Sequence, residues 1–225
     1  MNRAWSPLGA DRFYALVVER YFECAVFYRN VPEFVVQFGY AADAEESVVW
    51  QSVIEDDPVV HSNSKGSLTF ASSGDDSRST HLFFNVEENS FLDSQGFSPF
   101  GMIVEGYNTL NSLYNPTPGD SGGISQIDYE SGGNEWVLAN YPDVSMIQSI
   151  VLTDDIPVAD LGRDTTDTNG PSQAVTWTLL SIAAVAAGVG LYVGTTKCRQ
   201  SPYHSMDGSE TLSFQSEDNS VTVEL

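Results

Sequence analysis

The chain has 225 residues and a formal net charge of −22 at pH 7, because 31 acidic side chains outnumber nine lysines and arginines. That length fits one domain with additional segments. A chain this acidic repels nucleic acid and anionic lipid headgroups, so the composition argues against both as partners.

The cysteines and histidines give no sign of a metal site or a disulfide framework. Cys24 and Cys198 lie on opposite sides of an apolar segment, which argues against a disulfide framework. The three histidines are scattered, and no cluster of His, Cys and carboxylates has the spacing of metal ligands. We therefore expect neither a metal nor another cofactor.

The first residues predict a helix. Ser6 and Pro7 suit its start, and Phe13, Leu16 and Val17 follow at helical spacing. The beginning of the chain lacks a basic region followed by an apolar core, so no signal peptide is visible in it.

The stretch FYRNVPEFVVQFGY comes next and holds one basic side chain, Arg29, among apolar and aromatic ones. The strand period of two predicts that Phe34, Val36 and Phe38 share one face. A turn after Arg29 would bring its guanidinium over this sheet, near the amide of Gln37. Such a group suits a site that holds a peptide carbonyl beside an apolar ring. The alternative from these residues alone is a strand with one exposed arginine.

The middle of the chain is typical of a mainly β domain. Acidic, polar or Gly/Pro-rich stretches predict loops at residues 41–57, 72–79 and 115–133. A short helix is predicted over residues 107–114. Further strands are predicted at residues 67–71, 81–86, 101–105 and 144–152.

The composition changes after residue 152. Residues 153–173 are acidic and lack apolar periodicity, which predicts a solvated linker. Residues 174–194 carry no charge and have about the 20 residues needed to cross a bilayer as a helix. A buried core helix is the alternative, but the remaining chain offers no second core. Residues 195–225 are predicted to form a disordered tail.

The charges around this apolar segment predict its orientation. Lys197 and Arg199 follow it directly, whereas the preceding flank is acidic. The positive-inside rule therefore places the tail in the cytosol and residues 1–152 on the lumenal or extracellular side. We expect a single-pass membrane protein of the secretory pathway, anchored through residues 174–194.

Two blocks of this sequence resemble a known family. FYRNVPEFVVQFG is similar to the F-[HFY]-R-x-[IV]-P-x-F-x-x-Q-x-G signature of cyclophilins, the cyclophilin-type peptidyl-prolyl cis-trans isomerases. KGSLTFASSGDDSRSTHLFFNVEENSFLDSQGFSPFG resembles the family's second block, in the same order and spacing. The likeness extends from about residue 5 to about residue 152.

The resemblance implies an antiparallel β-barrel with capping helices over residues 1–152, and a site that binds proline-containing peptides without a cofactor. Two strands precede the first helix in that family, and almost nothing does here. Either the sequence is truncated at its N-terminus, or the barrel is completed in another way. An incomplete barrel should leave unpaired backbone on the neighbouring strands.

The resemblance also implies roles for individual residues. The catalytic group would be Arg29 with Gln37 and Phe34. The residues that match the family's substrate-binding positions are Val35, Ala71, Ser72, His81, Phe83, Phe91, Leu92 and Phe97.

Five of these positions depart from the common pattern. Val35 stands in place of Met, Ser72 in place of Asn, and His81 in place of Gln. Phe91 stands where some members carry a Trp linked to cyclosporin binding, which makes cyclosporin binding doubtful. Phe97 takes the position of a pocket histidine, in a segment one residue longer than the common form.

Three functions remain open from the sequence. The first is an active prolyl isomerase that assists protein folding at a membrane. The second is a catalytically weak, cyclophilin-like peptide-binding module, and the third is a membrane scaffold whose barrel serves only for adhesion.

Overall fold

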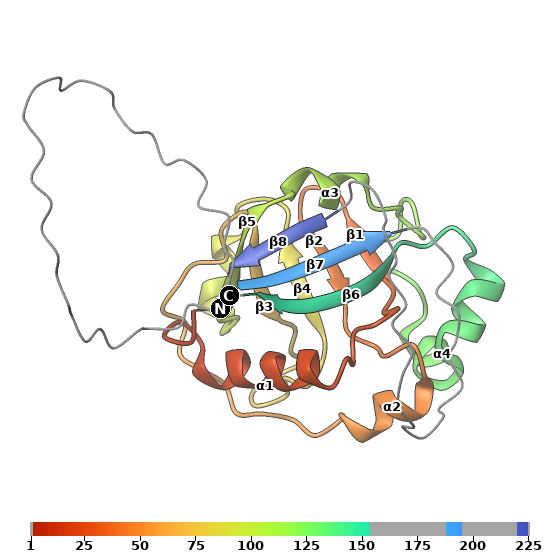
Figure 1. Ribbon diagram of the computed structural model, residues 1–225. Coiled ribbons are helices and arrows are strands. Elements are labelled where there is room, and N and C mark those ends of the chain that lie inside the picture. Colours follow the sequence, from red (N-terminus) through yellow and green to blue (C-terminus); the bar gives the residue numbers. More distant parts are fainter. Residues whose placement is uncertain (1, 154–187, 195–219, 225) are drawn as a thin grey trace, which may run out of the picture.

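The computed structural model describes residues 2–153, 188–194 and 220–224 (Figure 1). Its helices are α1 (Pro7–Val18), α2 (Ala44–Val49), the 3-10 helix η1 (Ser90–Gln95), α3 (Tyr107–Ser112) and α4 (Gln126–Asn140). Its strands are β1 (Arg29–Val31), β2 (Val35–Phe38), β3 (Ser67–Phe70), β4 (Leu82–Asn85), β5 (Pro99–Glu105), β6 (Met146–Thr153), β7 (Gly188–Gly194) and β8 (Ser220–Glu224).

The strands form one eight-stranded sheet in the order β1-β2-β4-β3-β5-β8-β7-β6, and every neighbouring pair is antiparallel. Figure 1 shows α1 along one side of the curved sheet and α3 on the opposite side. The prediction of an antiparallel sheet with helices is therefore confirmed.

The sheet is not closed as a barrel in the described part of the chain, since no strand ladder joins β1 to β6. The segment before β1 still reaches β6. Val26 and Met146 form an isolated antiparallel bridge. The N–H of Phe27 donates to the carbonyl of Ser145 at 3.0 Å. These contacts hold the two ends of the strand order next to each other.

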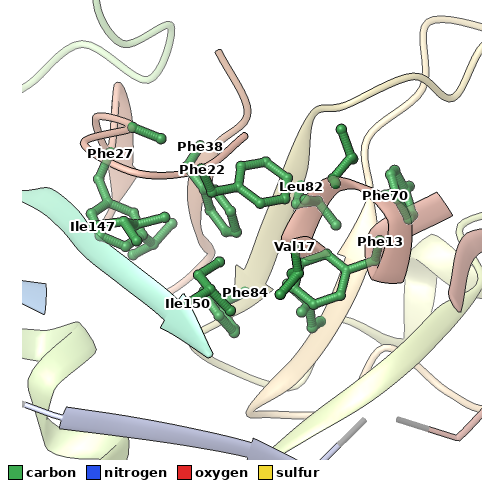
Figure 2. Packing of buried hydrophobic residues seen from close by; sticks show 14 of the residues in the cluster. Phe13, Val17, Phe22, Phe27, Phe38, Phe70, Leu82, Phe84, Ile147 and Ile150 are labelled. Carbon is green, nitrogen blue, oxygen red and sulfur yellow. The ribbon is translucent and has the colours of Figure 1, made fainter. Parts of the chain in front are cut away.

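An aromatic core fills the space between α1 and the inner face of the sheet (Figure 2). Phe13, Leu16 and Val17, predicted at helical spacing, are each at most 5% exposed. The rings of Phe22 and Phe38 meet edge to face with centroids 5.3 Å apart. Burying each such side chain contributes roughly 1.5–3 kcal/mol, so this core is the main source of the domain's stability.

The start of α1 is stabilised from a distant segment. Ser6 makes no side-chain cap to its own helix, and its hydroxyl donates to Asp57 at 2.6 Å. The N–H groups of Leu8 and Gly9 also donate to the Asp57 carboxylate, at 3.2 and 3.0 Å. Arg78 forms a buried ion pair with Asp57 at 3.1 Å. Asp57 therefore supplies the negative group that the N-terminus of a helix favours.

Two helical segments lie where the sequence predicted loops. The Asp43 side chain accepts the N–H of Glu45 at 2.8 Å and begins α2. The Ser125 side chain caps the first turn of α4, and Tyr129 and Val137 of that helix are buried. The loop prediction was wrong here because polar, Gly-rich composition conceals helices that are stabilised by caps and a few buried anchors.

The last seven residues of the predicted membrane helix, Gly188–Gly194, instead form strand β7. This strand pairs with β6 on one side and with β8 on the other. The structure contains no helix, within the residues it describes, that is long and apolar enough to cross a membrane. Hydropathy alone does not distinguish an apolar helix from an apolar strand, and glycine favours the helix least among non-proline residues.

Strand β8 comes from the region predicted to be a disordered tail, and it pairs with β5. Strand β5 is therefore paired on both sides, by β3 and β8, so the free edge that we expected on an incomplete barrel is absent from β5, whereas β6 has a strand partner on one side only, β7. The predicted linker after Thr153, residues 174–187 of the predicted span and residues 195–219 of the predicted tail lie outside the described residues.

Cys24 is disulfide-bonded, so the sequence argument against a disulfide framework was wrong for this residue. The other cysteine of the sequence is Cys198, outside the described residues. The backbone of Cys24 is also fixed, since its N–H donates to the carbonyl of Ile147 in β6 at 2.7 Å.

The central position of β7 leads to a first prediction. Leu191 lies opposite Ile150 of β6 and Val221 of β8. Leu191→Pro removes an N–H from a strand that is paired on both sides, a position that does not tolerate proline, at a cost of roughly 1–3 kcal/mol. We expect a lower midpoint of thermal unfolding for Leu191→Pro, and an unchanged one for Leu191→Val, which keeps the N–H. An equal midpoint for both variants would show that β7 does not stabilise the sheet.

Candidate active site

Arg29 and Gln37 face each other across the first two strands. They are direct partners in the β1–β2 register, and a turn with Glu33 at φ +60° joins the strands. Arg29 Nη1 donates to Gln37 Oε1 at 3.1 Å. The guanidinium carbon lies 5.7 Å from the centroid of the Phe34 ring, a cation–π distance. Arg29 therefore contacts both of the other predicted catalytic residues, Gln37 and Phe34.

An apolar cluster adjoins this arginine. Val35, Phe83 and Leu92 are its buried members, at 2–6% exposure. Three partly buried side chains pack against them, and all six were predicted substrate-binding or catalytic residues. The full apolar cluster is Phe34, Val35, Ala71, Phe83, Leu92 and Phe97.

Successive side chains of β2 point to opposite faces of the sheet, so the strand contributes to both the aromatic core and the apolar cluster. Val36 and Phe38 belong to the aromatic core, whereas Val35 belongs to the apolar cluster. Phe34 lies before β2 begins and joins the cluster, so the prediction that it shares a face with Val36 and Phe38 was wrong. Since the period of two applies only within the strand, a residue in the preceding turn does not follow it.

Phe91 lies at the rim of the apolar cluster. Its side chain is 54% exposed and stacks on Phe34 with ring centroids 6.0 Å apart. Phe97 approaches Phe83 edge to face at 5.8 Å. Helix η1 carries Phe91 and Leu92, so the position of η1 sets this wall of the cluster.

A polar network that sequence reasoning missed holds η1 in place. The Asp93 carboxylate accepts from Ser62 Oγ at 2.6 Å, and from both the N–H and Nδ2 of Asn63 at 2.8 Å. These hydrogen bonds outweigh burial and lower the pKa of Asp93. Asn89 Nδ2 donates to the carbonyl of Phe34 at 2.9 Å. Nothing in the local sequence indicates these pairings, because the partners lie 30 and 55 residues apart.

His81 and Ala71 meet through their backbones, since the N–H of Ala71 donates to the carbonyl of His81 at 2.9 Å. The His81 ring faces tyrosines: Nδ1 lies 3.0 Å from the hydroxyl of Tyr28, and the ring meets Tyr40 edge to face at 4.4 Å. Ser72 follows Ala71 and is partly exposed. Of the predicted substrate-binding residues, Ala71, Ser72 and His81 therefore lie next to one another, and the His81 ring is held by Tyr28 and Tyr40.

The predicted loop of residues 115–133, to which the sequence assigned no role in the site, contacts Arg29. Arg29 Nε donates to the carbonyl of Ser121, and the N–H of Ile124 donates to the carbonyl of Tyr28 at 2.8 Å. The guanidinium is therefore held at Nε and Nη1 by two neutral oxygens. Since neither partner is a carboxylate, the positive charge of Arg29 is not neutralised by them.

The burial of His81 leads to a prediction on pH. Burial lowers the pKa of His81 from 6.5 to about 4, so the unfolded chain binds the proton first as the pH falls. The resulting loss of unfolding free energy is absent above pH 6.5 and grows as the pH falls from 6.5 to 4. At pH 5 it reaches about 2 kcal/mol. His81→Gln should therefore lose less unfolding free energy between pH 7 and pH 5 than the unmodified chain, as measured by urea denaturation. Equal losses in both proteins would contradict this.

The sequence of this chain is similar to those of known proteins. Residues 2–128 match the model of the family described as cyclophilin type peptidyl-prolyl cis-trans isomerase/CLD. Peptidyl-prolyl cis-trans isomerase 10 of Caenorhabditis elegans is 28% identical over 113 residues, which cover 48% of this chain and 69% of that protein. A peptidyl-prolyl cis-trans isomerase of Acinetobacter baylyi is 25% identical over 116 residues, 49% of this chain and 62% of that protein.

Among solved structures, a cyclophilin-type peptidyl-prolyl cis-trans isomerase of Cryptosporidium parvum aligns with a TM-score of 0.45 and 23% identity, over 55% of this chain and 80% of that one. A second crystal structure of that protein was determined in the presence of the dipeptide Ala-Pro. The family model itself spans more than half of the present sequence. The chain therefore belongs to the cyclophilin-type peptidyl-prolyl cis-trans isomerases, and so to the isomerase class.

Proposed function

We propose that this chain catalyses cis-trans isomerisation of X–Pro bonds in peptides and proteins, with Arg29 as the catalytic residue. The single observation that carries the proposal is the placement of the Arg29 guanidinium, hydrogen-bonded to Gln37 and beside the ring of Phe34. A fixed cation next to an apolar surface is what this reaction requires.

The chemistry follows from the peptide bond. Its partial double-bond character gives a barrier of roughly 18–20 kcal/mol to rotation, and the two X–Pro isomers differ by only about 0.5–1 kcal/mol. A catalyst must therefore bind the twisted bond more tightly than either planar form. In the twisted state the prolyl nitrogen regains its lone pair, and a guanidinium close to that nitrogen stabilises it. No nucleophile is required.

The apolar cluster supplies the second requirement, a surface that holds the proline ring while the bond turns. Val35, Phe83 and Leu92 form its buried floor, and Phe91 offers an exposed ring at the rim. We propose that Ala71 and Ser72 hold the substrate backbone through their main-chain groups. His81 would contribute through its backbone and by fixing Ala71, since its ring is held by Tyr28.

The orientation of the His81 ring also favours a second candidate function. With Nδ1 bonded to Tyr28, His81 has less freedom to hold a substrate than the glutamine common at this position. A cyclophilin-like module that binds proline-containing peptides with little turnover is therefore the alternative. A protease-coupled assay on a proline tetrapeptide measures turnover, and titration of the same peptide followed by NMR measures binding. Binding without turnover would favour the module over the enzyme.

Arg29 itself can be tested directly. Arg29→Ala should lower kcat/KM on a proline tetrapeptide by about 100-fold or more, because it removes the group placed at the developing lone pair. Arg29→Lys should not restore full activity, since an ammonium does not reproduce the fixed fork of hydrogen bonds to Gln37 and Ser121. Arg3→Ala is the matched control, because Arg3 is exposed and pairs with Asp11 on the surface. An Arg29→Ala variant that is folded and fully active would refute the proposal.

We further propose a membrane setting for this activity, with residues 1–152 lumenal or extracellular and the C-terminus cytosolic. The uncharged residues 174–194, followed by Lys197 and Arg199, support this. A bilayer span and strand β7 would use the same residues, 188–194, so anchoring requires β7 to leave the sheet. It would also place Cys24 and Cys198 on opposite sides of the bilayer, so the disulfide of Cys24 would have to be made with a cysteine of another chain. Residues 153–173 would then link the domain to the bilayer.

Membrane association has its own test. The full-length protein, expressed in cells with an epitope after Leu225, should stay with membranes through alkaline carbonate extraction. In sealed microsomes, added protease should remove the epitope and spare the domain. Release of the protein into the carbonate supernatant would refute anchoring, and a protected epitope would refute the orientation.

A further inference from the structure

We infer that the loop of residues 120–124 positions the Arg29 guanidinium, and that Gly123 is the residue that allows it to do so. The inference rests on the proposed function, in which Arg29 acts on the twisted X–Pro bond. It concerns a different segment of the chain from the two motifs that indicate the family.

The loop holds Arg29 at one nitrogen and leaves another available. Nε donates to the carbonyl of Ser121, and Nη1 donates to Gln37 Oε1. Within the described residues, Nη2 has no hydrogen-bond partner. Two anchors on one planar group fix its position and its plane, so the remaining N–H groups have a defined direction for a substrate.

Gly123 lets the loop backbone lie directly on the strand that carries Arg29. Its φ is +79°, and a Cβ at this position would lie 2.6 Å from both the Arg29 Cβ and the carbonyl oxygen of Tyr28. Real Cβ atoms do not approach other atoms so closely. The neighbouring N–H of Ile124 donates to the same Tyr28 carbonyl at 2.8 Å. Any side chain at Gly123 would therefore push the loop away from Arg29.

The loop also fixes its own conformation. Asp120 Oδ1 accepts the N–H of Gly122 at 2.8 Å, and the N–H of Asp120 donates to the carbonyl of Thr117 at 3.0 Å. The first of these bonds closes over Ser121, and the second fixes the segment that leads into it. An Asx-type turn of this kind orients the backbone without help from the rest of the fold.

The effect of this positioning on catalysis follows from preorganisation. A guanidinium on a flexible side chain must be ordered when the transition state forms, which raises the barrier. Anchors at Nε and Nη1 order it beforehand. The loss of one anchor should therefore lower kcat more than it raises KM, because the apolar cluster that binds the proline ring is unchanged.

The test compares two glycines of the same conformation. Gly119 has φ +85°, and no atom lies within 4 Å of the position that a Cβ would take there, so Gly119→Ala introduces the same left-handed strain without the contact. Gly123→Ala should lower kcat on a proline tetrapeptide by about 10- to 100-fold with little change in KM. Gly119→Ala should keep kcat within about twofold of the unmodified protein. Equal kcat values for the two variants would overturn the inference.

A second readout reports on the arginine itself. In the unmodified protein the Arg29 Nε–H should give a distinct NMR signal protected from solvent exchange, because it donates to Ser121. Gly123→Ala should abolish this protection, and Gly119→Ala should retain it. If Gly123→Ala does not fold, Asp120→Ala replaces it, since it removes only the hydrogen bond to Gly122 and should lower both the protection and kcat. Full protection in Asp120→Ala or Gly123→Ala would overturn the inference.

The two proposals fail in different ways. If Arg29→Ala is fully active, the proposed role of Arg29 fails, and the exchange of its Nε–H still decides whether the loop holds it. If Arg29→Ala is inactive while Gly123→Ala and Asp120→Ala keep the kcat and the Nε–H protection of the unmodified protein, positioning by the loop fails and the catalytic role stands.

Discussion

The alternation of side chains along β2 is the constraint on which the rest of the molecule depends. Val36 and Phe38 point into the aromatic core, and Val35 and Gln37 point to the other face. Because one short strand serves both, the position of the site is fixed by the packing of the core. A shift of one residue in its register would exchange the two faces and separate Gln37 from Arg29.

Polar side chains, buried or partly buried, hold segments that do not pair with this strand. Asp93 fixes helix η1, and with it the wall formed by Phe91 and Leu92. Asp57 joins the start of α1 to Arg78 in a pair whose side chains are each 3% exposed. The buried Asp57–Arg78 pair contributes little net stability when both partners are present, but removing one partner leaves a buried charge uncompensated. The role of these polar groups is to give irregular segments a single position.

The C-terminal strands β7 and β8 complete the sheet, and β7 includes residues of the predicted membrane segment. Strands β7 and β8 lie between β5 and β6 and connect them into one continuous sheet. The hydrogen bonds of these strands satisfy backbone groups that would otherwise be exposed along two edges. A bilayer helix satisfies the same groups internally. Under the proposed anchoring, the two arrangements would compete for residues 188–194.

The sequence by itself determined the family, the antiparallel sheet and most of the candidate site. Arg29, Phe34, Val35 and Gln37 lie within nine residues, and the local pattern of a turn and a strand was sufficient to bring them together. Tertiary structure alone decided which distant residues fix these side chains and the helices around them. Ser121 meets Arg29 across 92 residues of chain, and Asp57 reaches Gly9 across 48. Contacts over such distances depend on how the whole chain packs, and neither side-chain periodicity nor composition carries a signal for them. The same reason explains why residues 188–194, part of an apolar segment whose hydropathy predicted a helix, form a strand beside β6.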